Sequence, residues 1–167
     1  IEPVDMAPLI LDVAAGLTPD FKTALHLEIS PSVTEIGLVA GSRAALQQVV
    51  ANLMINSAES ILSAGAAAGS LIVTAQYEQF HGRKMVGLSF VDNGDGIDPE
   101  HINQLFERGF STKHREGSGF GLHWSANTIQ ALGGQILIES GGRGQGTTLW
   151  VLLPSAENLL ANNSQKN

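Results

Sequence analysis

Residues 42–63 read S-R-A-A-L-Q-Q-V-V-A-N-L-M-I-N-S-A-E-S-I-L-S, and this stretch decides the fold. Ser42 is a candidate N-cap, because a serine hydroxyl can accept a hydrogen bond from an amide of the first helical turn. The residues at i, i+4 and i+7 spacing predict one buried stripe and therefore a long core helix that ends near Ser63. The stripe comprises Leu46, Val50, Leu53, Ser57 and Ile61.

Asn52, Asn56 and Ser60 follow a second stripe of the same helix, so the two asparagines face the same way. Asparagine disfavours helix interiors, because its amide competes for backbone hydrogen bonds. A solvated helix face explains this pair, and so does an amide oxygen that coordinates Mg²⁺. Both interpretations stay open on the residues alone.

Strands and further helices are expected on both sides of this helix. Two β-rich runs, residues 71–80 and 85–91, predict a hairpin. Because neighbouring strands are mostly joined by hairpins, we expect an α+β fold: a two-layer sandwich with a mixed, largely antiparallel sheet and about three helices on one face. The other expected elements are helices over Pro3–Leu17, Asp98–Phe106 and Gly119–Leu132, and strands over Thr23–Ile29, Ile36–Val39, Ile136–Glu139 and Thr147–Leu153.

The composition is that of a globular protein, with 167 residues, 43% of them hydrophobic. We expect one domain over residues 1–157 and a frayed polar tail over 158–167. The net charge of −7 argues against a nucleic-acid partner, and no apolar run approaches membrane-spanning length, so no membrane contact is expected. The lack of cysteine excludes zinc–thiolate sites and fits a cytoplasmic location. Since the chain starts at Ile1, we expect it to be a piece of a longer protein.

Three glycine-bearing clusters carry candidate chemistry. D-N-G-D-G-I at 92–97 follows an apolar strand; it fits an ordinary turn, or a backbone that approaches a flat ligand with Asp92 accepting from an exocyclic amine. G-S-G-F-G-L at 117–122 opens a helix, where amide groups can bind an anion. Its spacing is neither that of a dinucleotide-binding fold nor that of a P-loop. G-Q-G-T-T at 144–148 fits a tight hairpin.

Five segments in this order resemble a known family. Q-V-V-A-N-L-M-I-N-S-A-E-S, D-N-G-D-G-I, L-F-E-R-G-F-S-T-K, G-S-G-F-G-L and G-Q-G-T-T-L-W-V-L-L-P are similar to the N, G1, F, G2 and G3 boxes of bacterial sensor histidine kinases. The resemblance is to their catalytic ATP-binding domain, a Bergerat-type fold shared with gyrase, Hsp90 and MutL ATPases. It covers the chain from Pro3 to Pro154.

The resemblance implies a site for ATP and Mg²⁺. Asn56 is the implied magnesium ligand, Asn52 supports the phosphates or the metal, and Asp92 accepts from the adenine amine. Gly94 and Gly96 form the floor of the base pocket. The other implied nucleotide contacts are Ile97, Phe106, Phe110, Gly117, Ser118, Gly119, Phe120, Gly121, Leu122 and Thr147.

The chain departs from the family at three positions. Glu59 stands where many of these kinases carry a phosphate-binding lysine, and Ser57 stands in place of a common alanine. Arg108 replaces a frequent proline. We expect Lys113 to supply the missing cation, with Arg108 and Arg115 as alternatives.

The resemblance implies transfer of the γ-phosphoryl group of ATP to a histidine on a separate domain of the same parent protein, and onward to a response regulator. Within this chain His26 lies in an expected strand, which disfavours it as the acceptor. Three alternatives stay open: an ATPase of the same fold, an anti-sigma-factor serine kinase, and a degenerate nucleotide-binding module. ATPases of this fold resemble one another in carrying a glutamate four residues before the metal asparagine. This chain has Asn52 at that position. We also expect Gly109–Ser118 to form a lid that is poorly ordered without nucleotide.

Overall fold

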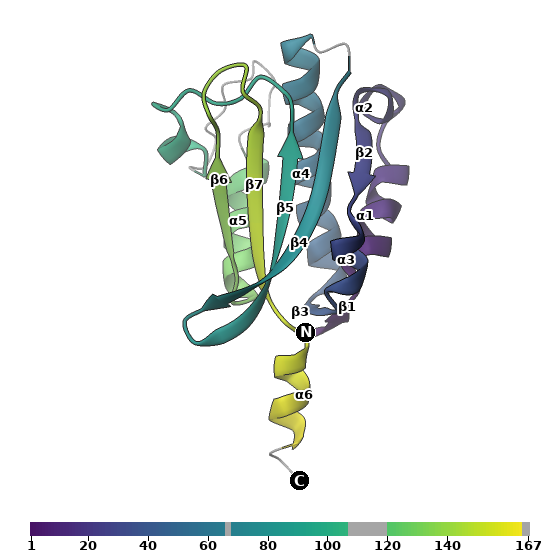
Figure 1. The fold of residues 1–167 in the computed structure, drawn as a ribbon, viewed down its shortest axis with the longest axis vertical. Coiled ribbons are helices and arrows are strands. Elements are labelled where there is room, and N and C mark those ends of the chain that lie inside the picture. Colours follow the sequence, from purple (N-terminus) through teal and green to yellow (C-terminus); the bar gives the residue numbers. More distant parts are fainter. Residues whose placement is uncertain (66–67, 107–119, 165–167) are drawn as a thin grey trace.

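The fold is built on one mixed β-sheet with helices on one of its faces (Figure 1). The computed structural model describes residues 1–65, 68–106 and 120–164. Five strands follow the order β2-β4-β5-β7-β6; β2 and β4 are parallel, and the other neighbours are antiparallel. The expected two-layer α+β sandwich is therefore confirmed. These strands are β2 (His26–Ile29), β4 (Ser70–Phe80), β5 (Arg83–Asp92), β6 (Gln135–Glu139) and β7 (Thr147–Pro154).

The helical layer contains α1 (Met6–Ala15), α4 (Arg43–Ala64) and α5 (Phe120–Ala131), with α4 packed against each of the other two. Figure 1 shows α4 and α5 behind the sheet and α1 along the side of β2. In the described part of the chain, no helix combines the length and the apolar character needed to cross a membrane. The remaining elements are β1 (Glu2–Val4), α2 (Pro19–Ala24), α3 (Pro31–Glu35), β3 (Val39–Gly41), a 3-10 turn (Ile102–Gln104) and α6 (Glu157–Ser164).

Helix α4 forms as its sequence predicts. Ser42 Oγ accepts a hydrogen bond from Ala45 N at 3.4 Å, and Gly65 ends the helix in the left-handed conformation with φ of 62°. Every member of the predicted stripe is buried. The helix thus presents its apolar side to the sheet and keeps Asn52 and Asn56 on a different, half-buried side.

The N-terminal region differs from expectation in three places. The first helix is shorter than Pro3–Leu17, because β1 pairs with β3 before it begins. The expected strand over Thr23–Ile29 starts at His26, because Pro19 at the first position of α2 favours a helical turn there. The strand expected at Ile36–Val39 lies instead at β3, three residues further along.

The expected helix over Asp98–Phe106 is wrong. Asp98 and Pro99 are start signals, but the segment is too short to offset the cost of helix nucleation. It forms turns and one 3-10 turn, with hydrogen bonds three residues apart from His101 N to Asp98 O and from Gln104 N to His101 O. The expected fraying of 158–167 is also wrong up to Ser164, where the structure has α6.

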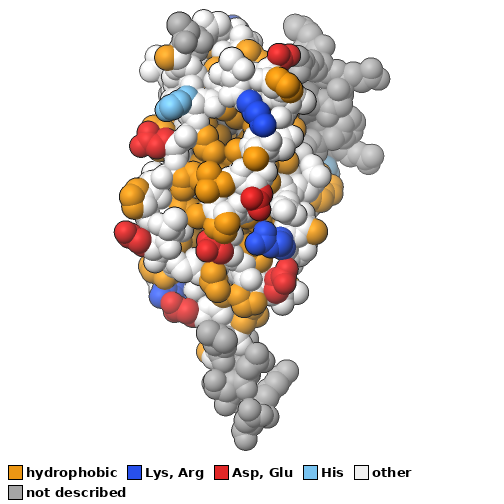
Figure 2. Space-filling model, turned by 90° about the vertical axis from the view of Figure 1, so that its right-hand side faces the viewer, with side chains coloured by type: hydrophobic (Ala, Val, Ile, Leu, Met, Phe, Trp, Pro, Cys, Tyr) orange, Lys and Arg blue, Asp and Glu red, His pale blue; other side chains and the backbone are white. Residues whose placement is uncertain are grey.

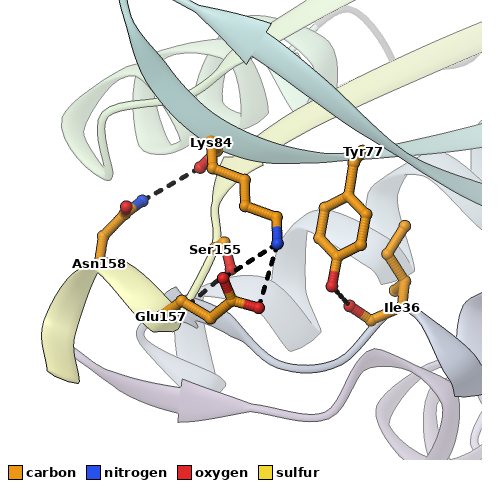
Figure 3. A network of polar contacts seen from close by, with 6 residues as sticks. All are labelled: Ile36, Tyr77, Lys84, Ser155, Glu157 and Asn158. Atoms are coloured by element: carbon orange, nitrogen blue, oxygen red, sulfur yellow. Dashed lines mark hydrogen bonds and ion pairs between the residues drawn. The ribbon is translucent and has the colours of Figure 1, made fainter. Parts of the chain in front are cut away.

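Helix α6 is anchored to the sheet by Lys84 on β5 (Figure 3). The Lys84 ammonium donates to both carboxylate oxygens of Glu157, at 2.9 and 3.2 Å, and Asn158 Nδ2 donates to the Lys84 carbonyl at 3.0 Å. The ammonium also lies 3.9 Å from the centre of the Tyr77 ring, whose hydroxyl donates to Ile36 O. These tertiary contacts fix the start of a helix that its polar sequence does not predict.

The flank with α1, α2 and β2 has apolar side chains at its centre and charged ones around them (Figure 2). Leu11 on α1 is 55% exposed. A small hollow of about 70 Å³ on this flank is lined by Ala14, Leu17 and Leu27 among others. The opposite ends of the molecule differ in character: N-terminus and α6 lie at one end, and the glycine-bearing loops at the other (Figure 1).

Candidate functional site

Asp92 is the last residue of β5 and stands at the glycine-bearing end of the sheet. It pairs with Leu71 on one side and Thr147 on the other, so its side chain points to the same face as those two buried residues. The carboxylate is 4% exposed, and its Oδ1 accepts a hydrogen bond from Gly94 N at 2.9 Å. The residue predicted to select the base is thus held in a fixed orientation at the strand end.

The glycines of this loop lie where no side chain fits. A Cβ on Gly94 would lie 2.4 Å from Ser60 Oγ and 2.8 Å from the Ser60 carbonyl carbon. Gly96 has φ of 72°, and a Cβ there would lie 2.1 Å from Gly142 O. The loop after β5 is therefore pressed against α4 on one side and against the β6–β7 turn on the other.

Ser140 connects two of these segments. Its hydroxyl accepts from Ile97 N at 3.0 Å and donates to Gly146 O at 2.8 Å. Ser140 thus joins the loop after β5 to the turn before Thr147. Thr147 itself is buried. The sequence analysis missed Ser140, because a serine beside a glycine-rich turn is typical of any hairpin.

The end of α4 holds the same loop from its other side. Asp95 N donates to Ser60 Oγ at 3.0 Å, and Ser63 Oγ donates to Asp95 Oδ2 at 2.9 Å. Asn93 fixes the start of β4 by accepting from Ser70 N at 2.8 Å. Ser60 was placed on the asparagine stripe, but its role as a loop anchor depends on tertiary contact.

Asn52 joins α4 to the first turn of α5. Its Nδ2 donates to Ser125 Oγ at 3.2 Å and to Gly121 O at 3.5 Å, and its Oδ1 accepts from Gln48 Nε2 at 3.1 Å. Asn56 lies one turn further along α4, half-buried, between Asn52 and the Ser60 anchor. The two asparagines therefore border the space between α4 and the start of α5.

The region before α5 is also tied to that helix. Phe106 is half-buried against the core, and its carbonyl lies 2.9 Å from His123 Nδ1. Leu122 is buried and Phe120 begins α5. The predicted site residues Phe110, Lys113, Gly117, Ser118 and Gly119, with the lid expected over 109–118 and the alternatives Arg108 and Arg115, lie outside the described residues.

A hollow of about 350 Å³ adjoins the same strand ends. Asp92 and Thr147 line it, but so do Val91 and Thr148, whose side chains alternate to the open face of the sheet. The hollow therefore opens on the face away from α4. The space bordered by Asn52 and Asn56 lies on the helical face.

The residues present fit an adenine nucleotide with magnesium. A buried carboxylate beside a buried threonine suits a base with an amine, and the positions of Gly94, Gly96 and Gly146 exclude side chains from its surroundings. The Asn56 amide is a hard oxygen donor, as Mg²⁺ prefers. Among the described residues, no group of three or more His, Asp or Glu is arranged to hold a metal ion.

Comparisons with known proteins identify the family of the chain. The family model "Histidine kinase-, DNA gyrase B-, and HSP90-like ATPase" matches residues 41–157. The chain is 32% identical over 162 residues to the signal transduction histidine-protein kinase BaeS of Escherichia coli K12, covering 94% of this chain and 32% of that protein. It is 32% identical over 178 residues to the sensory histidine kinase/phosphatase NtrB of Rhizobium meliloti, covering 95% of this chain and 44% of that protein.

Solved structures share the fold. The mycobacterial sensor histidine kinase MprB superposes with a TM-score of 0.72 at 23% identity, covering 92% of this chain and 97% of that one. Full-length ShkA in complex with AMPPNP gives a TM-score of 0.69 at 25% identity, covering 92% of this chain and 30% of that one. The chain thus spans less than half of BaeS, NtrB or ShkA, and each of them continues beyond the shared region.

Proposed function

Because the chain belongs to the family of histidine kinase-, DNA gyrase B- and HSP90-like ATPases, we propose that it is the catalytic ATP-binding domain of a two-component sensor histidine kinase. It binds Mg-ATP and transfers the γ-phosphoryl group to a histidine on a separate domain of the same parent protein. The observation that carries this proposal is the buried Asp92 carboxylate, fixed by Gly94 N between α4 and the start of β7.

Asp92 recognises the base by accepting a hydrogen bond from the exocyclic amine of adenine. Guanine places a carbonyl oxygen at that position, which repels a carboxylate, so the same contact selects ATP over GTP. Thr147 lies beside Asp92 on the neighbouring strand and contributes a second polar group. Gly94 and Gly96 are proposed to form the floor of the base pocket, and their lack of side chains lets this loop pack against α4 and the β6–β7 turn.

Asn56 would hold the magnesium ion, with Asn52 supporting the same region from the previous turn. When bound there, Mg²⁺ would supply positive charge that offsets the charge of the phosphates. Lys113 is proposed to add the cation that Glu59 does not supply. The amide groups at Gly117, Gly119 and Gly121 are proposed to contact the phosphates near the start of α5.

The chemistry of Asn52 favours transfer over hydrolysis. An ATPase of this fold would need a general base four residues before the metal asparagine, and an amide cannot accept a proton there. In this chain the Asn52 amide is also occupied by Ser125, Gly121 and Gln48. Water is therefore poorly activated, and the phosphoryl group persists until an acceptor histidine is presented.

The rest of the pathway is proposed from the relatives. The phosphoacceptor domain belongs to the same parent protein, and the phosphoryl group passes onward to a response regulator in the cytoplasm. The names of BaeS and NtrB as histidine kinases support this, and so does their length beyond the shared region.

The test uses the full-length parent protein incubated with Mg²⁺ and γ-labelled ATP. We expect a protein-bound label that is lost in acid and retained in alkali, as a phosphohistidine is. The Asn56→Ala variant should fold and lose this label. An acid-stable label would indicate a serine kinase, and free phosphate without labelled protein would indicate an ATPase. If neither product forms, the chain is only a binding module. Each of these three outcomes contradicts the proposal.

A further inference from the structure

Ser57 carries a hydroxyl that its surroundings do not satisfy. The residue is 1% exposed, and among the described residues no hydrogen-bond partner lies within reach of its Oγ. A serine inside a helix ordinarily bonds the carbonyl four residues earlier, and Ser57 does not. Since folded proteins pair nearly all buried polar groups, an unpaired hydroxyl needs an explanation.

The position of Ser57 follows from the packing of α4 on β5. Ser60 and Ile61 are the residues of α4 that touch the Gly94 position. Ser57 lies one turn earlier, which is about 5.4 Å back along the helix. Asp92 ends β5 two residues before Gly94, and its carboxylate accepts a hydrogen bond from Gly94 N.

Helix and strand run in the same direction here, so Ser57 and Asp92 both precede the contact between Ser60 and Gly94. Helix α4 ends just before β4 begins, and the start of β4 pairs with the end of β5 through Leu71 and Asp92 (Figure 1). Both side chains are buried between the helix and the sheet. The unpaired hydroxyl and the base-selecting carboxylate therefore border the same space.

We propose that Ser57 is a specificity-determining residue that contacts the purine base together with Asp92. This inference rests on the proposed adenine site. In adenine the exocyclic amine that faces Asp92 is flanked by two ring nitrogens, and both are hydrogen-bond acceptors. The Ser57 hydroxyl donates to one of these nitrogens, directly or through one water. An acceptor at Asp92 and a donor at Ser57 together match adenine.

The alternative is a purely structural serine, a small residue chosen to fit between α4 and β5. That role predicts an effect on stability and none on nucleotide affinity. Binding to the base predicts the reverse, because removing an unpaired buried hydroxyl relieves its desolvation cost in the free protein. The two roles are thus separated by measurements on the unliganded and the liganded protein.

The experiment compares the 167-residue chain with its Ser57→Ala variant. Calorimetric titration with ADP should show affinity reduced about 3- to 10-fold, the effect of one lost hydrogen bond. Urea unfolding without nucleotide should show a variant at least as stable as the wild type. Ser89→Ala is the matched control, because Ser89 is equally buried but paired with Thr74 on the open face. It should lose stability and keep its affinity for ADP.

The ring contact is tested with 1-deaza-ADP and 7-deaza-ADP, each of which lacks one of the two ring nitrogens. The analogue that lacks the contacted nitrogen should bind the wild type more weakly than ADP does. It should bind Ser57→Ala with the same affinity as ADP. The role of Ser57 is overturned if Ser57→Ala binds ADP as tightly as the wild type does, or if the variant fails to fold. It is also overturned if, with both analogues, the loss of affinity from the analogue adds to the loss from the substitution. If the wild type binds no ADP, the proposed adenine site itself fails.

Discussion

Asp92 shows how one residue gains its role from its backbone neighbours. The carboxylate is buried at the end of β5, yet Gly94 N donates to it, which offsets part of the cost of removing a charge from water. The same hydrogen bond orients it toward the helical face, where it can accept from an amine.

We predict that Asp92→Asn weakens ATP binding by at least ~1–2 kcal/mol, the loss of a hydrogen bond to a charged group. Calorimetric titration of the folded variant measures the change. Asp20→Asn on α2, an exposed position outside the predicted site residues, is the control and should bind as the wild type does. Equal affinities for Asp92→Asn and the wild type would contradict the assignment of the base contact.

At this scale the sequence predicted which residues lie together at the strand ends, but not those that hold them in place. Asp92, Gly94 and Thr147 were implied by the resemblance to the family motifs, and the structure places them next to one another. Ser140 acts across more than forty residues through backbone groups of Ile97 and Gly146, and no local pattern signals such contacts. The residues between 107 and 119 stay predictions.

The elements meet at the site through loops fixed at both ends. The loop after β5 is held by α4 through Ser60 and by the β6–β7 turn through Ser140. Helix α4 was predictable in full, because its cap, its apolar stripe and its terminal glycine agree. The turns that begin at Asp98 and helix α6 were not predictable from the sequence. A short segment and a polar tail take their structure from contacts with other parts of the chain.

We predict that Ser140→Ala lowers the free energy of unfolding by about 1–3 kcal/mol, because Ile97 N and Gly146 O lose the hydroxyl that pairs them. Urea denaturation measures this change. Ser63→Ala removes an exposed hydrogen bond to Asp95 and serves as the control, with an expected change within about 0.5 kcal/mol. Equal effects of the two substitutions would show that Ser140 does not connect the segments.

The strand ends with the proposed nucleotide site lie at one end of the molecule, and the N-terminus and α6 lie toward the other (Figure 1). At the latter end β1 pairs with β3, Ala156 N donates to Leu38 O, and Glu157 bonds Lys84. Strand β1 and the end of β7 therefore lie close to one another through β3.

The anchor of α6 should depend on pH. The hydrogen bond to Glu157 raises the pKa of Lys84 above its ordinary value of 10.5. A raised pKa in the folded state means that the contact is fully present below pH 10.5 and is lost as the pH rises through the higher folded value. At neutral pH the contact between Lys84 and Glu157 is therefore present in the wild type. Glu157→Gln weakens this contact, so hydrogen exchange of the α6 amides should be faster in the variant than in the wild type.

Global stability should barely change in that variant, because the pair is exposed to solvent. Glu35→Gln, another exposed carboxylate, is the control and should leave exchange in α6 unchanged. Equal protection of α6 in Glu157→Gln and in the wild type would mean that the Lys84 contact does not hold the helix.

The most direct test of the account is calorimetric titration of the 167-residue chain with ATP, ADP and GTP, each with and without Mg²⁺. The account predicts saturable binding of one adenine nucleotide per chain, tighter binding of ATP in the presence of Mg²⁺, and much weaker binding of GTP. Absence of adenine-nucleotide binding under every divalent-ion condition, or equal affinity for GTP and ATP, would contradict the site built around Asp92.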